Sequence, residues 1–169
     1  LAGIMIPGGE STTLLNLMRD EPWFDALRRF HREGGAFLAT CAGAILLSKR
    51  VKNPVQPSLG LLDATIERNG WGRQIDSFEA TLDAPALGGE IDAVFIRAPR
   101  FKALGPKVET LARIGAEPVL VRQGRILAMT FHPELTGNGR LHCAFLEMAE
   151  ERRAALADPQ EARPRVVAS

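Results

Sequence analysis

The chain has 169 residues, of which 46% are hydrophobic and 24% charged, and this composition suits one globular domain with a substantial core. Lys and Arg number 21 against 20 Asp and Glu, so nothing indicates binding to nucleic acid or to a membrane surface. No apolar stretch approaches the ~20 residues that span a bilayer, and no signal peptide is visible. Two cysteines make a poor disulfide framework, so we expect a reducing, cytoplasmic setting.

The first fifty residues alternate strands with helices. Apolar runs are typical of short buried strands, whereas apolar residues at helical spacing indicate amphipathic helices. We expect, in order, a strand over 1–6, a helix that Ser11 or Thr12 caps, a helix from Pro22 to Gly34, a strand over 36–40 and a helix over 42–50. Because the chain opens partway along an apolar strand, we also expect that it lacks a natural N-terminal segment.

The remainder is richer in strands. We expect strands over 62–69, 75–84 and 91–99, a hairpin over 117–131 that turns at Gln123-Gly124, and a helix over 138–156. Leu141, Phe145 and Met148 recur at helical spacing, so they should face inward on that last helix.

This order of elements predicts the fold class. Strands that alternate with helices early and pair as hairpins later favour an α/β protein, a three-layer sandwich with a mixed, mostly parallel central sheet. We assign residues 1–157 to one domain. Residues 158–169 carry two prolines and little apolar periodicity, and they are expected to form a mobile tail.

Cys41 lies where an apolar strand gives way to a helix, in the segment FLATCAGAILL. Small residues around a nucleophile at such a turn are typical of a nucleophile elbow, because bulky ones would clash with the following helix. The N-terminus of that helix is expected to lower the pKa of Cys41 below ~8.5. The alternative is a packed thiol, since cysteine often serves as a small buried hydrophobe.

A nucleophilic thiol needs a base, and the chain has three histidines. His31 lies among arginines on a helix, and His142 points ~100° away from its neighbour Cys143 on another. His132 ends a predicted strand, where α/β folds place their ligand sites. Glu134 follows at a spacing that lets its carboxylate stand beside the imidazole. These residues predict a Cys41-His132-Glu134 triad, although FHPE could also be a structural strand end.

The run IPGGEST follows the first strand. Its glycines let backbone N–H groups approach a ligand closely. A phosphate is disfavoured, because the run has no lysine and Glu10 would repel it. The simpler alternative is a tight turn followed by a helix cap.

Six motifs occur together in one order: PGGEST, TCAGAILLSK, ERNGWGRQIDSFE, FIRAP, VRQG and FHPELT. Together they resemble the class I glutamine amidotransferases, and within these the glutaminase subunits of pyridoxal 5′-phosphate synthases. The resemblance runs from residue 1 to about 150. PGGEST and ERNGWGRQIDSFE are its most specific parts, because the triad signature is shared across the superfamily.

The resemblance implies the roles of the site residues. Cys41 would be the nucleophile, His132 the general base and acid, and Glu134 the group that orients the histidine. The glutamine-binding residues would be Gly9, Glu10, Ser11, Arg68, Ile96 and Arg97. An arginine fits the α-carboxylate of glutamine, and on chemical grounds Glu10 could take the α-ammonium. Backbone N–H groups of Gly8, Gly9 and Ala42 would form the oxyanion hole.

The resemblance also implies a partner. Ammonia released from L-glutamine would pass to a separate (β/α)₈-barrel synthase subunit, and the hydrolysis itself would need no metal or organic cofactor. Two departures stand out: an expected N-terminal strand-helix-strand segment is missing, and Ala39 stands where the family usually has glycine.

Other functions remain open at this point. The glutaminase subunit of imidazole glycerol phosphate synthase shares the elbow and the His-Pro-Glu run, but ERNGWGRQIDSFE is not expected there. A non-catalytic docking module and a cysteine peptidase or chaperone of a related α/β sandwich are further alternatives. The intact triad disfavours the docking module, and the candidate glutamine-binding set Glu10, Arg68 and Arg97 disfavours the peptidase or chaperone.

Overall fold

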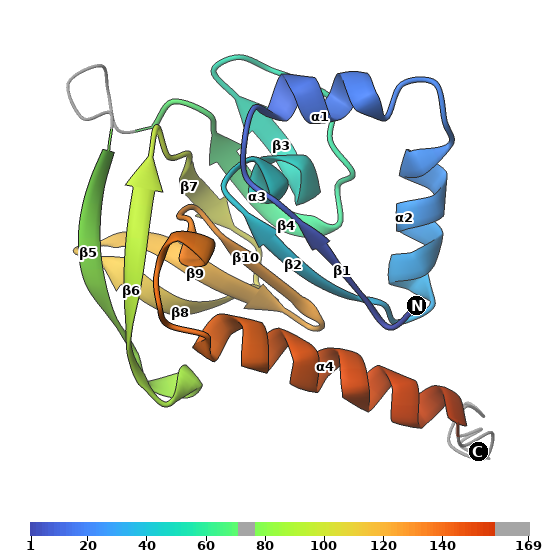
Figure 1. Cartoon of the computed structure of the whole chain (residues 1–169). Helices are drawn as coiled ribbons and strands as arrows, with labels where there is room; N and C mark the ends of the chain where they lie inside the picture. The colour runs from blue at the N-terminus through green and yellow to red at the C-terminus, as the bar shows by residue number, and fades with distance from the viewer. Residues whose placement is uncertain (71–76, 158–169) are drawn as a thin grey trace, which may run out of the picture.

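The computed structural model describes residues 1–70 and 77–157 and is built on a five-stranded central sheet with the strand order β1-β2-β10-β9-β8 (Figure 1). Its strands are β1 (Gly3–Ile6), β2 (Ala36–Thr40), β8 (Glu109–Ile114), β9 (Glu117–Gln123) and β10 (Ile126–Met129). β1, β2 and β10 run parallel, whereas β9 pairs antiparallel with both β10 and β8. The sheet is therefore mixed, as predicted, but among the described strands parallel pairings do not outnumber antiparallel ones.

One face of the sheet is covered by the last helix and a two-stranded hairpin. These are α4 (Arg140–Ala157), β5 (Ser77–Ala84) and β6 (Gly89–Ile96), with the short 3-10 helix η1 (Pro85–Leu87) between the two strands. Side chains alternate along a strand, so Ala36 and Leu38 of β2 point to this face. They share a core with Phe95, Phe131 and Phe145. The predicted inward positions of the last helix follow from this packing.

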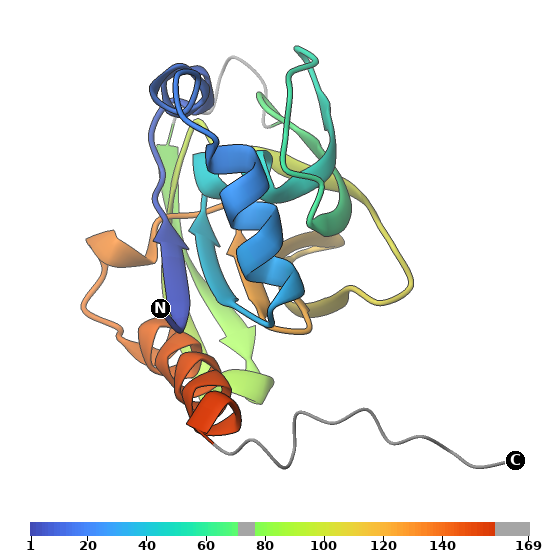
Figure 2. The same ribbon diagram turned by 90° about the vertical axis from the view of Figure 1, so that its right-hand side faces the viewer.

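The other face is covered by the first three helices and a small three-stranded sheet. These are α1 (Ser11–Leu17), α2 (Trp23–Arg32), α3 (Ala42–Leu47), β3 (Ser48–Lys52), β4 (Leu62–Glu67) and β7 (Arg100–Leu104). Phe37 and Ala39, the alternate residues of β2, belong to this second core together with Leu46 and Leu47 of α3. Figure 2 shows β1 and β2 between α4 on one side and α2 on the other, the expected three layers.

Several predicted elements are confirmed, and others are wrong. The strand over 36–40 has the predicted bounds, and a hairpin of β9 and β10 turns after Gln123. The helix predicted over 42–50 ends at Leu47, because Ser48–Lys52 continues as β3 and pairs with β4. Sequence analysis does not predict β7 or β8. Residues 71–76 and the expected tail, 158–169, lie outside the described residues.

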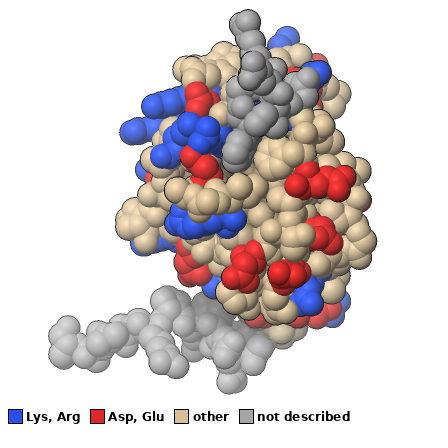
Figure 3. All heavy atoms as spheres, turned by 90° about the vertical axis from the view of Figure 1, so that its left-hand side faces the viewer, with Lys and Arg blue, Asp and Glu red and all other residues tan. Residues whose placement is uncertain are grey.

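The hairpin presents an acidic outer face. Glu79, Asp83, Glu90 and Asp92 are all exposed there, because they alternate with the residues that β5 and β6 bury. Figure 3 views this side of the molecule, where Asp and Glu gather apart from most Lys and Arg. Among the described helices none is long and apolar enough to cross a membrane.

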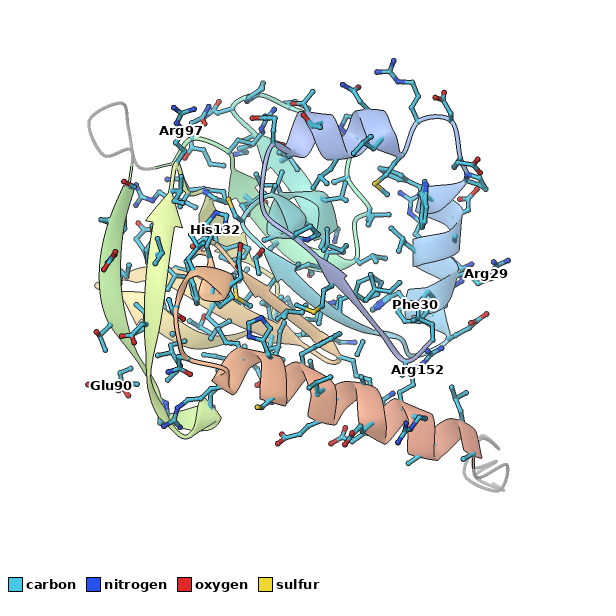
Figure 4. All side chains as sticks on the ribbon, viewed as in Figure 1. Arg29, Phe30, Glu90, Arg97, His132 and Arg152 are labelled. Atoms are coloured by element: carbon cyan, nitrogen blue, oxygen red, sulfur yellow. The ribbon has the colours of Figure 1, made fainter. Side chains whose placement is uncertain are left out.

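A buried arginine joins the two ends of the described domain. Arg152 of α4 is 5% exposed and donates hydrogen bonds to the backbone carbonyls of Glu33 and Leu1. Its guanidinium also lies 4.6 Å from the centroid of the Phe30 ring. Figure 4 shows Arg152 and Phe30 meeting at the junction of α2 and α4. Because its guanidinium binds these backbone carbonyls, we assign Arg152 a structural role, in which it holds α4 against the N-terminal residue and the end of α2.

Candidate active site

Three parallel strands place the candidate catalytic residues at one edge of the central sheet. The loop from Pro7 to Glu10 follows β1, Cys41 follows β2, and His132 lies three residues after the end of β10. Because parallel strands end at the same edge, residues distant in the sequence converge there. The structure thus brings together the segments that sequence analysis predicts to meet.

Cys41 occupies a strained turn between β2 and α3. Its backbone φ is 46° and ψ −103°, a conformation that residues with a Cβ rarely adopt. The Cys41 N–H donates to the Met129 carbonyl at 2.9 Å, which fixes the turn to β10. A Cβ on Gly43 would lie 2.2 Å from the Ile6 carbonyl oxygen, so only glycine lets α3 pack this closely on β1. The small residues of the turn therefore have a direct steric cause.

His132 is held at both its backbone and its ring. Its N–H donates to the Val94 carbonyl at 2.8 Å, and its Nδ1 lies 2.7 Å from Glu134 Oε1. Glu134 lies in the 3-10 helix η2 (Pro133–Leu135), not in an extended segment as the spacing argument assumes. The tight turn nevertheless brings its carboxylate to the imidazole. This contact leaves Nε2 as the ring nitrogen that can exchange a proton with another group.

Gly8 lies between the cysteine and the histidine. A Cβ built on Gly8 would lie 2.4 Å from His132 Cε1 and 3.4 Å from Cys41 Cβ. The loop after β1 therefore packs directly against both candidate catalytic side chains. Any residue larger than glycine at position 8 would displace the imidazole. The position of His132 therefore depends on the position of this loop.

Burial raises the pKa of the Cys41 thiol to about 11, above its ordinary value. The backbone N–H groups of Ala42 and Gly9 oppose this shift, whereas the nearby charges of Glu134 and Glu10 add to it. The expectation that the helix N-terminus would lower this pKa is therefore wrong. Cys41 is only 6% exposed and α3 has only six residues, so desolvation outweighs the helix dipole.

Glu10 and Arg68, both predicted to hold glutamine, are paired with each other. The Arg68 guanidinium donates to Glu10 Oε1 at 2.7 Å and to Thr12 Oγ1 at 3.2 Å. Glu10 also caps α1, accepting from the Thr12 N–H at 3.4 Å, so the predicted Ser11 or Thr12 cap is wrong. The carboxylate and the guanidinium thus stand side by side at the mouth of the site, with Glu10 the more exposed.

The side chain of Ser11, a residue predicted to bind glutamine, is buried and so cannot reach a substrate. It is 2% exposed, and its Oγ donates to Gln56 Oε1 at 2.9 Å. The hydroxyl is therefore engaged within the protein, and only the backbone of Ser11 is available to a substrate. Sequence analysis does not find Gln56, because its segment NPVQP carries no recognisable motif.

Ile96 and Arg97 lie at the end of β6, the strand whose Val94 binds the backbone of His132. Both are exposed at the end of β6, and Arg97 has a positive φ of 43°. Figure 4 shows Arg97 at the tip of β6 and His132 beside the same strand. Since Val94 of β6 forms a bridge with the backbone of His132, the hairpin ties the position of Arg97 to that of the candidate base.

The second cysteine, Cys143, lies outside the core. Cys143 is exposed on α4, because it lies two residues after buried Leu141 and so points to the opposite side of the helix. Both cysteines are free thiols. Within residues 1–70 and 77–157, no cluster of His, Cys, Asp and Glu could hold a metal ion.

Comparison with known proteins identifies relatives along most of the chain. A family model described as the SNO glutamine amidotransferase family matches residues 1–151. The pyridoxal 5′-phosphate synthase subunit PdxT of Deinococcus radiodurans is 50% identical over 157 residues, covering 90% of this chain and 80% of that protein. A PdxT of Thermus thermophilus is 53% identical over 151 residues, with coverages of 88% and 78%.

Solved structures agree with these matches. A crystal structure of a glutamine amidotransferase superposes with a TM-score of 0.84 at 52% identity, covering 89% of this chain and 80% of that one. A glutamine amidotransferase from Thermotoga maritima gives a TM-score of 0.56 at 15% identity, with coverages of 94% and 67%. The second match shows a shared fold alone. The predicted α/β fold with a mixed sheet is confirmed by the first.

Proposed function

The chain belongs to the SNO glutamine amidotransferase family, and on that premise we propose that it hydrolyses L-glutamine as the glutaminase subunit of a pyridoxal 5′-phosphate synthase. One observation carries the proposal: a cysteine on a strained strand-to-helix turn and a histidine whose Nδ1 is bound by a glutamate both lie against Gly8. The relatives named PdxT support the choice of synthase.

The reaction begins at the side-chain amide of glutamine. Cys41 gives its proton to His132, and the sulfur attacks the amide carbon, so that a C–S bond forms and the carbonyl π electrons move to oxygen. As the C–N bond breaks, His132 returns the proton to the departing nitrogen and ammonia leaves. Water, deprotonated by His132, then attacks the thioester and releases glutamate and the thiol.

The raised pKa of Cys41 gives the histidine a specific task. A thiol with a pKa of about 11 is almost entirely protonated at neutral pH, so the free protein holds a poor nucleophile. Proton transfer to His132 must accompany attack, and Glu134 stabilises the imidazolium that results. The backbone N–H groups of Ala42 and Gly9, which already favour the thiolate, supply donors for the oxyanion, with Gly8 shaping the loop.

The charged groups of glutamine match the pair at the mouth of the site. Arg68 takes the α-carboxylate and Glu10 the α-ammonium, so the zwitterion replaces one internal ion pair by two intermolecular ones. Arg97, Ile96 and the backbone of Gly9 and Ser11 complete the pocket. Because both ions of the internal pair find new partners, opening the pair leaves no charge unsatisfied.

The ammonia requires an acceptor enzyme. The relatives are named as subunits of a synthase, which supports a partner subunit, and we assign that role to the (β/α)₈-barrel synthase implied by the motifs. The hydrolysis uses thiol, imidazole and carboxylate groups of this chain, and no step calls for a metal or organic cofactor. The two free thiols support a cytoplasmic setting, where cysteines are kept reduced.

Glutamate production from glutamine, measured with and without a barrel synthase subunit, tests the proposal. We expect low turnover for the chain alone and a rise when the synthase binds, because the glycine peptides of the Pro7-Gly8-Gly9 loop can rotate at little cost and bring a further donor, the Gly8 N–H, toward the oxyanion. One misplaced oxyanion donor costs ~10²–10³ in turnover, so the rise is measurable. Absence of glutamate formation at saturating synthase would refute the proposed activity. High turnover that does not change on addition of synthase would refute the coupling alone.

A further inference from the structure

We infer that Gln56 is a positioning residue for glutamine hydrolysis, acting through the buried hydroxyl of Ser11 to hold the Pro7–Ser11 loop against Cys41. The inference rests on the proposed function, since it assigns Gln56 a role in that reaction. Gln56 lies in the 53–61 segment that connects β3 to β4, 45 residues from Ser11 along the chain. Their hydrogen bond therefore joins two separate segments.

The segment that carries Gln56 is fixed to the helix that begins at the nucleophile. The N–H of Leu59 donates to the Leu46 carbonyl at 2.7 Å, and that of Leu61 donates to the Leu47 carbonyl at 2.9 Å. Leu46 and Leu47 form the last turn of α3, whose first residue follows Cys41. Arg28 of α2 adds a hydrogen bond to the Leu59 carbonyl at 3.1 Å. The position of Gln56 is thus tied to that of α3.

The hydroxyl that Gln56 binds belongs to Ser11, which is both the first residue of α1 and the last residue of the Pro7–Ser11 loop. Ser11 is the first residue of α1, so fixing its side chain fixes the C-terminal end of the loop. Gly9, two residues earlier, has a φ of 119°, and a Cβ added to it would meet nothing within 4 Å, so no neighbour packs against that side of the residue. Its N–H nevertheless opposes the rise in the Cys41 pKa and so favours the thiolate. The placement of this donor therefore depends on the loop ends.

Two contacts hold this end of the loop, the Glu10–Arg68 ion pair and the Ser11–Gln56 hydrogen bond, and the second is the more buried. Glu10 pairs with Arg68, but the Glu10 side chain is 62% exposed, and exposed ion pairs contribute little. Ser11 is buried, so loss of its acceptor would leave an unsatisfied hydroxyl. Gln56 Nε2 is itself buried and has no partner among the described residues, so the carboxamide contributes its hydrogen bond to Ser11 alone. We therefore expect the amide to serve loop placement.

The test is steady-state glutamine hydrolysis with saturating barrel synthase. Gln56→Met keeps the length and removes the acceptor, and we expect kcat to fall roughly tenfold, part of the ~10²–10³ that loss of an oxyanion donor costs. KM should change less, because the Gly9 N–H binds charge that develops in the transition state. Ser11→Ala should give a similar loss, and the double variant should be no worse than either single one.

Gln123 offers a matched control. Its Oε1 accepts from the Asp63 N–H at 2.8 Å and its Nε2 donates to the Leu61 carbonyl at 3.0 Å, so this glutamine also bridges two segments but does not contact the loop. Gln123→Met should lower the unfolding temperature and leave kcat of the folded enzyme unchanged. Gln56→Glu, which keeps an acceptor for Ser11, should recover most of the kcat that Gln56→Met loses.

The outcomes separate the two claims. If the parent chain forms no glutamate at all, the proposed function fails before Gln56 is tested. If the parent is active and Gln56→Met has the parent kcat, the positioning role is wrong. Additive losses in Ser11→Ala and Gln56→Met would also overturn it, because a shared hydrogen bond cannot be lost twice. A fall in the unfolding temperature with kcat unchanged would leave Gln56 as a stabilising residue only.

Discussion

The proposed nucleophile and the loop that carries two of the proposed substrate-binding residues lie together at one edge of the central sheet, but they are held in different ways. Residues 35–48, which include β2, Cys41 and α3, are all buried, and steric contacts fix the turn. Residues 7–10 are exposed except for the half-buried Gly8, and Glu10 is positioned by polar contacts to Arg68 and Thr12. The proposed nucleophile is thus placed by the core, whereas Gly9 and Glu10, two of the residues proposed to bind glutamine, lie on an exposed loop.

This difference predicts where substitutions act. A change in the buried turn should damage the chemical step or the fold, because close packing leaves no room to relax. A change in the loop should affect binding and turnover while the domain stays folded, because exposed segments tolerate change. Four measurements test this division.

Replacing the nucleophile should have the largest effect. We expect Cys41→Ala to lower glutaminase kcat by at least ~10⁴-fold, since the covalent pathway is removed. Cys143→Ala is the control, and it should keep parental activity because the exposed thiol on α4 lies away from the site. The readout is glutamate formation with synthase present. Comparable losses in the two variants would contradict the assignment of Cys41.

Glu134→Gln should be less damaging than Cys41→Ala or His132→Ala. The carboxylate orients the imidazole at 2.7 Å and stabilises its charge, but it forms no bond to the substrate. We expect its loss of kcat to be about tenfold to a hundredfold smaller than that of Cys41→Ala. Steady-state kinetics of the three variants decide the order. A Glu134→Gln variant as inactive as Cys41→Ala would mean that the carboxylate has a more direct role.

Two glycines compare the buried turn with the loop directly. In Gly43→Ala the new methyl would meet the Ile6 carbonyl at 2.2 Å, and we expect the free energy of unfolding to fall by about 3 kcal/mol or more. In Gly9→Ala the methyl meets nothing within 4 Å, and the cost is the strain of a positive φ, about 1–2 kcal/mol. Urea unfolding of both variants measures the difference. Equal losses would show that the loop is packed as tightly as the turn.

The smallest expected effect is a loss of stability at alkaline pH that comes from the buried Cys41 thiol. The folded-state pKa of Cys41 is raised to about 11, above the ~8.5 of an unfolded cysteine. The stability from this group is therefore fully present below pH ~8.5 and is lost as the pH rises through about 11. Cys41→Ala should lose less stability than the parent over this window, by at most about 3 kcal/mol. Parallel pH profiles of the two proteins would refute the shift.

The elements that sequence analysis locates correctly have one dominant local cause. Residues 36–40 are apolar or small because both of their faces are buried, and this continuous pattern predicts a strand with its observed bounds. The spacing of His132 and Glu134 alone predicts that they lie together, and they are in contact, although in a 3-10 turn. Short-range patterns are reliable where burial on all sides leaves few alternatives.

The features that sequence analysis misses depend on tertiary contacts. Ser48–Lys52 continues a helical pattern in the sequence, but it becomes β3 because β4 offers a parallel partner. The direction of the Cys41 pKa shift is mispredicted because desolvation depends on packing from α3, β10 and the loop, none of which the local sequence shows. Gln56 lies in no recognisable motif, and only its hydrogen bond to Ser11 in the folded chain indicates a role.

The raised pKa of Cys41 also bears on how long the enzyme survives oxidants. Peroxides attack thiolates, so a cysteine that stays protonated and 6% exposed is a slow target for sulfenic acid formation. Cys143 is exposed, so its oxidation would be an early but catalytically silent lesion. The same burial that keeps the thiol protonated, and so dependent on His132 in the proposed mechanism, therefore also slows the oxidation of its sulfur.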